Sequence, residues 1–541
     1  MPDSSIANGN VVNMALHHAH EHPDKIAIVV PTKWDEERVL EEQVYTYKEL
    51  MERMQTFRAG LEAEGFEPGD RVILLFAVSA DFFAMIMAIL ANGLTVVLID
   101  TGMGTERIKS AMETANAKGI ITMHALLKYR FMIKQLRRIP KKFSVDKAGW
   151  FVKHVDKLTA CGATVAKALT RGPEDEALIT FTSGSTGAPK GANRTHGFLM
   201  AQHKAFRASL PDFEGQIEIQ SFPVVALHNL SCGASSVMPA VNLATPAAVN
   251  PKVLYDQITS WHVNSMGAAP AFMGRLGDYL KKENITIPTM IRCFTGGAPV
   301  SVDLCQTLLD SFPNVEGYAV YGSTEAEPMA KALFEDVIKL DGQGDGFLAG
   351  KVATVSEIVI VQFPEEPPKI GPEGVKPHIQ PQGSLGEIIV RGDHVNRGYI
   401  DNPQANLENK VPEPDGSIWH RTGDVGYFDV NGMLWLTGRL KDAVSHYGKM
   451  IQPLPIEAEL DGLPQIFRSA IVSSQRAPNG HIYVQLMEGE NPESVKTEIL
   501  ERLAARGMKA IDVEFVEKMA VDGRHNSKID RPTLRAQLDK S

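Results

Sequence analysis

Cysteine is scarce in this sequence of 541 residues. The four cysteines are Cys161, Cys232, Cys293 and Cys305, and none of them forms a C-x-x-C pair or follows a metal-ligand spacing. This pattern argues against a disulfide-stapled fold and against a structural metal site. We therefore expect buried, reduced thiols, as in a cytoplasmic protein.

A membrane-spanning run is also missing. The most apolar stretch, residues 72–99, is interrupted by Asp81 and Gly93, which favours strand, helix and strand over a single span. The first ten residues have neither a basic start nor an apolar core, so we expect no signal peptide.

Basic residues are fewer than acidic ones, and the formal net charge is −10. A chain of this sign repels phosphate backbones, so we expect no general nucleic-acid binding. Apolar residues make up 44% and charged residues 22%, an ordinary globular composition.

Strand and helix patterns alternate along the chain. At this length one hydrophobic core is too small, and at least two domains are expected. Thr46 is placed to cap a helix whose apolar positions recur every three or four residues, at Leu50, Met54, Phe57 and Leu61. Short apolar strands follow at βαβ spacing, at residues 71–76, 94–100 and 119–122. The sequence predicts an α/β fold with a mostly parallel sheet.

A domain boundary is expected after Gly438. Residues 1–438 would form a large domain of layered α/β subdomains, and residues 439–541 a small α+β domain. Within the large domain, residues 128–157 hold ten Lys or Arg against two acids, interleaved with aromatic residues. This local charge predicts an exposed face that binds a membrane surface or a partner protein, with Ile133, Leu136 and Ile139 as its apolar side. The alternative is a solvated helix whose apolar side packs on the protein's own core.

The strongest chemical signal is a Thr/Ser/Gly-rich loop after the apolar strand 177–181. Small residues let backbone N–H groups, hydroxyls and one lysine approach a polyphosphate. The loop is not a Walker P-loop, because Lys190 precedes a glycine rather than Ser or Thr. Its residues are Thr182, Ser183, Gly184, Ser185, Thr186, Gly187 and Lys190.

Four later motifs supply the other groups that nucleotide chemistry needs. They offer an aromatic face, hydroxyls, carboxylates and a cation for charge that develops on oxygen. They comprise Tyr321-Gly322-Ser323-Thr324-Glu325, Trp419-His-Arg-Thr-Gly-Asp424, Gly438-Arg439 and Arg524-His-Asn-Ser-Lys528.

Together, and in this order, the motifs resemble the adenylate-forming superfamily of acyl-CoA synthetases, adenylation domains and luciferases. The resemblance implies ATP as a substrate and Mg²⁺ as its cation, bound by Glu325. It implies that Thr182 to Lys190 hold phosphates, that Thr324 contacts the α-phosphate beside Gly322 and Ser323, and that Lys528 contacts the reacting carboxylate. The last motif departs from the usual Ser-Gly-Lys, because Asn526-Ser527 precedes Lys528.

The resemblance also assigns the remaining roles. Adenine would lie against Gly297, Ala298, Pro299 and Tyr321, and ribose against Asp424 and Arg439. Lys441 would be the hinge of a mobile C-terminal domain. His228 and Gly296 would line the acyl pocket, although His228 could equally be a structural histidine.

Several stretches are most similar to one branch, the β-lactone synthetases of bacterial long-chain olefin synthesis. They include 97–104, 296–301, 321–328, 419–427 and 524–529. This branch implies that a long-chain, optionally 2-alkylated, 3-hydroxy acid is adenylated, and that its own hydroxyl then expels AMP to close a β-lactone.

Three alternatives stay open. They are an acyl-CoA synthetase, an enzyme that loads acyl groups onto a carrier protein, and a catalytically silent binding module. The bulky turn Ser445-His446-Tyr447 stands where CoA ligases often have smaller residues, which disfavours a path for CoA. The joint presence of Glu325, Asp424 and Lys528 disfavours a silent module.

Overall fold

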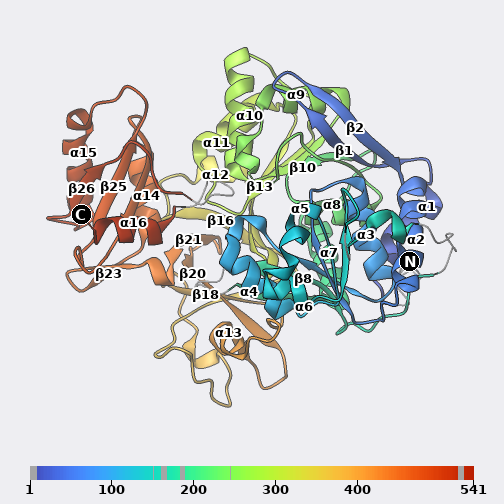
Figure 1. The fold of residues 1–541 in the computed structure, drawn as a ribbon. Coiled ribbons are helices and arrows are strands. Elements are labelled where there is room, and N and C mark those ends of the chain that lie inside the picture. Colours follow the sequence, from blue (N-terminus) through green and yellow to red (C-terminus); the bar gives the residue numbers. More distant parts are fainter. Residues whose placement is uncertain are drawn as a thin grey trace.

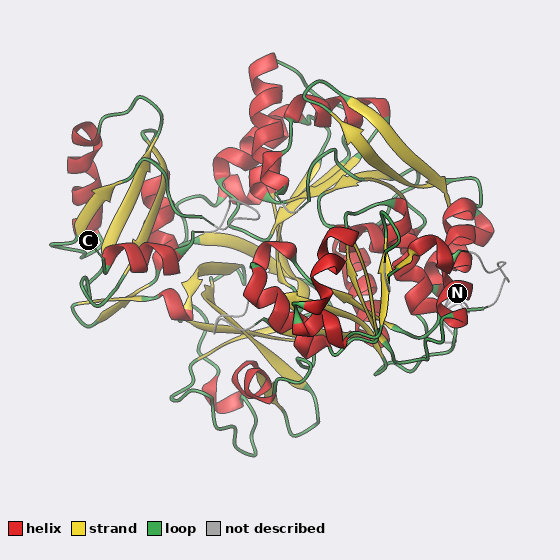
Figure 2. Cartoon of the chain, viewed as in Figure 1, coloured by secondary structure: helices red, strands yellow, loops and turns green. Residues whose placement is uncertain are grey.

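The computed structural model describes residues 9–149, 152–159, 167–182, 189–243, 245–521 and 529–540. Two large sheets with packed helices form the body of the molecule, and the C-terminal elements form a separate lobe on the left of Figure 1. Figure 2 shows helices and strands mixed throughout both parts, which confirms the predicted α/β class. Within the described part, no helix is long and apolar enough to span a bilayer.

The first sheet has seven strands in the order β7-β6-β5-β3-β4-β8-β9. Every neighbouring pair is parallel except β8 with β9, which form an antiparallel hairpin. The strands are β3 (Arg71–Leu75), β4 (Thr95–Leu98), β5 (Gly119–Thr122), β6 (Lys141–Ser144), β7 (Lys153–His154), β8 (Glu176–Thr182) and β9 (Lys190–Thr195).

The second sheet has 14 strands and changes character along its width. A parallel part contains β1 (Ile26–Trp34), β11 (Ser235–Val237), β10 (Ile217–Gln220), β12 (Ser265–Ala268), β13 (Arg292–Gly296) and β14 (Glu316–Ser323), and β2 (Val39–Thr46) pairs antiparallel with β1. An antiparallel part continues through β15 (Ala326–Leu333), β16 (Phe347–Val352), β21 (Leu434–Arg439), β20 (Ile418–Phe428), β18 (Gly386–Arg391), β17 (Glu357–Val361) and β19 (Lys410–Pro412).

Helices pack against both sheets. They are α1 (Asn13–Glu21), α2 (Tyr47–Ala63), α3 (Ala80–Ala91), α4 (Thr105–Ala115), α5 (His124–Leu127), α6 (Lys134–Arg138), α7 (His196–Ser209), α8 (Pro223–Cys232), α9 (Pro251–Ser260), α10 (Pro270–Glu283), α11 (Val302–Ser311), α12 (Phe334–Lys339) and α13 (Pro403–Asn409). The predicted cap of α2 is confirmed: the Thr46 hydroxyl accepts from the Glu49 N–H, and the Glu49 carboxylate accepts from the Thr46 N–H. The predicted apolar positions of α2 are all buried.

The C-terminal lobe has its own sheets and its own apolar cores. It contains β22 (Val444–His446), β23 (Lys449–Ile451), α14 (Pro453–Asp461), β24 (Ile466–Val472), β25 (His481–Leu486), α15 (Pro492–Ala505), β26 (Asp512–Phe515) and α16 (Arg531–Leu538). The expected boundary after Gly438 falls at the end of β21. Arg506 connects the lobes, because its guanidinium pairs with Asp345 at 2.9 Å and also with Glu459.

The expectation for residues 128–157 was wrong in one respect. Leu136 and Ile139 do not form an exposed apolar side; they are buried in a core under the first sheet. Residues Lys141–Ser144 form the inner strand β6, in which Phe143 is buried. A parallel strand needs cover on both faces, and this requirement outweighs the local charge of the segment.

The predicted free thiols are found where the structure describes them. Cys293 and Cys305 are buried and Cys232 is partly buried, and all three are free. Cys161 lies outside the described residues.

A buried ion pair ties the parallel strands of the second sheet together. The carboxylate of Glu218 in β10 accepts from Arg292 of β13 at 3.0 Å and from the Ser265 hydroxyl of β12 at 2.6 Å. The amide of Asn229 in α8 donates to the other oxygen of Glu218 at 2.9 Å. Since both charged side chains are almost fully buried, each depends on the other for compensation.

Replacing Arg292 with Met should therefore lower the free energy of unfolding by about 3–5 kcal/mol, because the Glu218 carboxylate would stay buried without its partner. Denaturant titration measures the change. The double variant Arg292→Met/Glu218→Gln should recover part of the loss. Lys33→Met, which breaks an exposed pair with Glu41, is the matched control and should cost about 1 kcal/mol or less. An equal, small effect of both single variants would contradict the prediction.

Candidate active site

A large cleft runs between the body and the C-terminal lobe. Its volume of about 2460 Å³ exceeds the range of roughly 300–1,000 Å³ that is usual for a small-molecule site. Residues of the body that line it include Gly297, Tyr321, Thr324, Asp424 and Arg439, and the C-terminal lobe contributes Leu454, Glu457 and Arg531, among others. The cleft can therefore hold a nucleotide together with a second, extended molecule.

Tyr321, Asp424 and Arg439 meet in this cleft, as the sequence predicts for a nucleotide site. The Tyr321 hydroxyl donates to one carboxylate oxygen of Asp424 at 2.8 Å, and Arg439 Nε donates to the other at 3.0 Å. Asp424 and Arg439 are register partners in β20 and β21. Burial, followed by the charge of Asp424, raises the pKa of Tyr321 well above its usual value, so the phenol stays protonated. These contacts hold the carboxylate of Asp424 in a fixed orientation.

The predicted adenine segment follows β13. Gly297, Ala298 and Pro299 line the cleft. Gly297 has φ of 83°, and a Cβ added there would meet no atom within 4 Å, so its surroundings are open. Gly296, by contrast, is not among the lining residues: a Cβ there would come within 2.4 Å of the Val320 carbonyl oxygen. Its glycine lets β13 and β14 approach closely.

Glu325 lies in the turn between β14 and β15 and is held from two sides. Tyr399 donates its hydroxyl to the carboxylate at 2.9 Å, and the Asn396 N–H donates to the Glu325 carbonyl at 2.6 Å. Burial by itself raises the pKa of Glu325, but His420, Lys410 and the Tyr399 hydroxyl outweigh it and lower the pKa. The side chain is therefore a carboxylate at neutral pH.

Glu325 is not among the residues that line the cleft, although its carboxylate is of the kind that would hold a magnesium ion. Mg²⁺ prefers hard oxygen donors such as the Glu325 carboxylate. Ser323 lines the cleft, and its hydroxyl is buried with no hydrogen-bond partner in the described part of the chain. Such a group can satisfy its donor on a phosphate oxygen.

The predicted phosphate loop connects β8 and β9, where Thr182 and Lys190 are register partners. Ser183, Gly184, Ser185, Thr186 and Gly187 lie outside the described residues, as does Lys528. Lys190 is buried with its ammonium 5.5 Å from the Tyr399 ring centre. Burial lowers the pKa of Lys190, and Glu408 and Glu325 partly offset this effect.

Sequence reasoning missed Arg194 and Lys410. Arg194 donates to the Thr324 carbonyl at 2.9 Å and so holds the turn against β9. The Lys410 ammonium contacts the Asn396 carbonyl and lies 3.3 Å from His420 Nδ1. Burial lowers the pKa of Lys410 to about 7, although Glu325 opposes the shift. The dipeptide Asn409-Lys410, at the junction of α13 and β19, carries no local sign of this burial.

The predicted hinge residue lines the cleft at the lobe boundary. Lys441 follows Arg439 closely, and its carbonyl accepts from Arg535 at 3.4 Å. Arg535 also pairs with Asp442 at 3.0 Å. Burial lowers the pKa of Lys441, and Asp442 opposes this effect.

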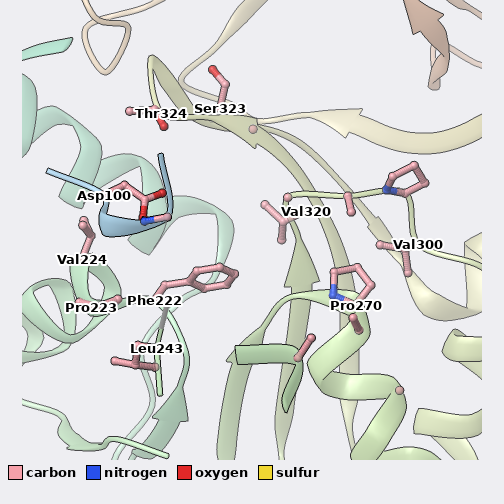
Figure 3. Close-up of a pocket in the computed structure, with 18 of the residues that line it drawn as sticks. Asp100, Phe222, Pro223, Val224, Leu243, Pro270, Val300, Val320, Ser323 and Thr324 are labelled. Carbon is pink, nitrogen blue, oxygen red and sulfur yellow. The ribbon is translucent and has the colours of Figure 1, made fainter. Parts of the chain in front are cut away.

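A limb of the cleft with mostly apolar walls, the apolar limb, begins beside Ser323 and Thr324 (Figure 3). Phe222, Val224 and Leu243 line one side, with the carboxylate of Asp100 near Val224, and Pro270, Val300 and Val320 line the other. His228 is not a lining residue of the cleft; it lines a second, smaller cavity beside it. The limb can accept an alkyl chain while Ser323 and Thr324 face the reacting end.

The fold and these groups define an adenylate-forming enzyme, which joins a carboxylic acid to AMP at the expense of ATP. The chain belongs to the AMP-binding enzyme family, whose model matches residues 16–400. It is 29% identical to an olefin β-lactone synthetase of Stenotrophomonas maltophilia over 96% of this chain and 97% of the relative. The resemblance predicted from the motifs is confirmed.

Other relatives and solved structures extend the comparison. A 4-coumarate–CoA ligase of Nicotiana tabacum is 24% identical over 92% of this chain and 90% of its own length. An amide bond synthetase from Marinactinospora thermotolerans shares the fold with a TM-score of 0.78, at 19% identity, over 98% of this chain and 99% of that chain.

The lowered pKa of Lys410 should make the free energy of unfolding depend on pH. In the unfolded chain a lysine keeps its proton to about pH 10.4, whereas folded Lys410 loses it near pH 7. The unfolded state thus binds more protons between these values, and folding becomes more favourable as the pH rises. From pH 7 to 10 the wild type should gain roughly 2–4 kcal/mol relative to Lys410→Met.

Denaturant titrations across this pH range measure the difference. Lys281→Met, at an exposed lysine of α10, should follow the wild-type profile. Parallel profiles of the wild type and Lys410→Met would show that the amine is not perturbed.

Proposed function

We propose that the protein activates a long-chain 3-hydroxy acid, with or without a 2-alkyl branch, as acyl-AMP and then closes it to a β-lactone. The observation that supports this best is the apolar limb of the cleft, which begins beside Ser323 and Thr324 and has room for an alkyl chain. The near full-length similarity to an olefin β-lactone synthetase supports the same reaction.

In the first step a carboxylate oxygen attacks the α-phosphorus of ATP and pyrophosphate leaves. Gly297–Pro299 and Tyr321 would flank adenine, and Asp424 with Arg439 would hold ribose. Thr324 and Lys528 would meet the α-phosphate, and Lys190 with the loop before it would meet the outer phosphates. Mg²⁺, bound through Glu325, would neutralise charge on the phosphates.

In the second step the β-hydroxyl oxygen attacks the acyl carbon, its proton leaves to solvent, and AMP departs with the electrons of the broken C–O bond. The nucleophile is tethered to the electrophile, so no second substrate has to be brought in. The cleft must exclude water, which would otherwise hydrolyse the adenylate.

An acyl-CoA ligase is the second candidate, and the similarity to a 4-coumarate–CoA ligase favours it. The bulky turn at His446 and Tyr447 does not line the cleft in this arrangement of the lobes. The two reactions differ in the acceptor of the acyl group, and an analysis of the products can identify it. An enzyme that loads a carrier protein would, without its carrier, give only hydrolysed acid or a bound adenylate in the same analysis.

We expect a 3-hydroxy acid with ATP and no CoA to give AMP, pyrophosphate and β-lactone, and an acid without the hydroxyl to stall as bound adenylate. Mass spectrometry of the products tests both statements. Lys528→Ala should slow pyrophosphate release about a hundredfold or more, because transition-state charge would lose its partner. If a simple acid with CoA gives acyl-CoA faster than the hydroxy acid gives lactone, the CoA-ligase function is correct.

We also propose that the enzyme collects its acid from an anionic membrane surface. Four apolar side chains stand out near the start of the basic segment, and we call them the mouth patch: Met123, Tyr129, Phe131 and Met132, exposed by 42%, 54%, 61% and 82%. Of these four, Met123 also lines the cleft. The same stretch of chain carries exposed cations at Lys128, Lys134, Arg137 and Arg138.

The structure changes which cations should be altered to test this contact. Lys141 and Lys142 belong to β6 and contact backbone carbonyls, and Arg138 pairs with Glu113, so Lys128, Lys134 and Arg137 are the better choice. Each basic residue near an anionic surface contributes about 1 kcal/mol. Wild type should sediment with anionic vesicles at low salt and be released at high salt.

The triple variant Lys128→Glu/Lys134→Glu/Arg137→Glu should stay in the supernatant. A variant with the same charge change at the exposed residues Lys281, Lys282 and Lys540 should sediment like the wild type. Equal sedimentation of all three proteins would mean that the segment is only a solvated face.

A further inference from the structure

A second glutamate follows the turn that carries Glu325. Glu327 is the second residue of β15, is partly buried, and lines the cleft together with Ser323 and Thr324. Its side chain packs on the backbone of Gly322, because a Cβ added at that glycine would come within 2.9 Å of the Glu327 Cγ. The Glu327 side chain therefore lies beside the turn at which the apolar limb begins.

This carboxylate is not held by the protein in the way that the other two carboxylates of the site are. Glu325 and Asp424 each accept from a tyrosine hydroxyl. Among the described residues, no donor forms a hydrogen bond or an ion pair with the carboxylate of Glu327. Since partly buried polar groups are nearly always hydrogen-bonded, a partner from outside the described chain is expected.

A buried cation lies near Glu327 without donating to it. Arg194 of β9 also lines the cleft, and its guanidinium donates to the Thr324 carbonyl at 2.9 Å. Burial lowers the pKa of Arg194, and the charges of Glu327 and Glu325 oppose this shift. The guanidinium therefore stabilises a negative charge at Glu327, while the oxygens of that side chain keep their capacity to accept.

An acceptor of this kind suits a ligand that brings a donor. The acid of the proposed reaction carries one donor besides its carboxyl group, which is the 3-hydroxyl. That hydroxyl lies on the second carbon from the carboxyl carbon, so a group that binds it must be close to the carboxyl group, for which we propose a place beside Thr324. Glu327 meets this requirement, because its side chain packs on the same turn.

We propose that Glu327 recognises the 3-hydroxyl group of the acid, whose O–H donates a hydrogen bond to the Glu327 carboxylate. This role rests on the proposed function and deepens it, because it specifies how hydroxy acids are selected over plain acids. The same hydrogen bond would hold the hydroxyl oxygen near the acyl carbon that it attacks in the second step.

Two variants weaken the interaction to different extents. Glu327→Leu removes the acceptor at similar volume, whereas Glu327→Gln keeps the shape and one carbonyl oxygen but loses the charge. The first turnover of pyrophosphate release is measured at subsaturating acid, because an acid without the hydroxyl is expected to stall after one turnover. A 3-hydroxy acid is compared with the unsubstituted acid of the same length, and thermal unfolding confirms that each variant folds.

The ratio of the rate with the hydroxy acid to the rate with the plain acid should fall about tenfold or more in Glu327→Leu. It should fall less in Glu327→Gln, because a neutral oxygen is a weaker acceptor than a carboxylate. The plain acid is the internal reference, since it makes no such hydrogen bond. Asp278→Asn, at an exposed carboxylate of α10 that also lines the cleft, should keep the wild-type ratio.

An unchanged ratio in both folded variants would overturn this role of Glu327. With the ratio unchanged, equal slowing of both acids would indicate a purely structural role, a greater Mg²⁺ requirement a contact with the metal, and a higher KM for ATP a contact with the nucleotide. Failure of the proposed function looks different: no lactone would form from the hydroxy acid, while the ratio of first-turnover rates would still fall in the variants.

Discussion

The turn from Tyr321 to Glu325 is the constraint on which the rest of the site depends. It connects β14 and β15 at the point where the second sheet changes from parallel to antiparallel. Arg194 of β9, in the first sheet, donates to the Thr324 carbonyl, and the Tyr399 hydroxyl donates to the Glu325 carboxylate. Asp424 of β20 accepts from the Tyr321 hydroxyl. Residues from three distant parts of the chain therefore converge on these five residues, and a shift in any of them would move groups for which we propose contacts with adenine, phosphate and magnesium.

Charged groups and apolar groups gather at different residues around that turn. The ammonium groups of Lys190 and Lys410 lie near Glu325, whose charge opposes the lowering of their pKa by burial. The apolar limb runs past Val224 and Val320. The carboxylate of Asp100 is a charged group that borders the limb, near Val224. In the proposed reaction the carboxyl group of the acid would lie beside Thr324.

The sequence predicted the features that are local. The cap at Thr46, the α/β class and the meeting of Tyr321, Asp424 and Arg439 follow from short motifs with a physical meaning. Lys410 could not be found in this way, because its burial depends on contacts with Asn396 and on the approach of Tyr399 and Glu325 from distant segments. Leu136 and Ile139 show the opposite error: a strong local charge pattern concealed residues that the neighbouring sheet requires as core.

Arg439 is both the last residue of β21 and a partner of Asp424, and Lys441, two positions later, is bound to the C-terminal lobe through Arg535. With so short a tether, the Asp424 carboxylate, for which we propose a role in ribose binding, and the C-terminal lobe are connected to the same strand end. Any difference in nucleotide affinity between two lobe orientations must equal the bias that the nucleotide imposes on those orientations. In the proposed reaction the strand end at Arg439 would couple nucleotide binding to the orientation of the lobe, and each would shift the other by the same free energy.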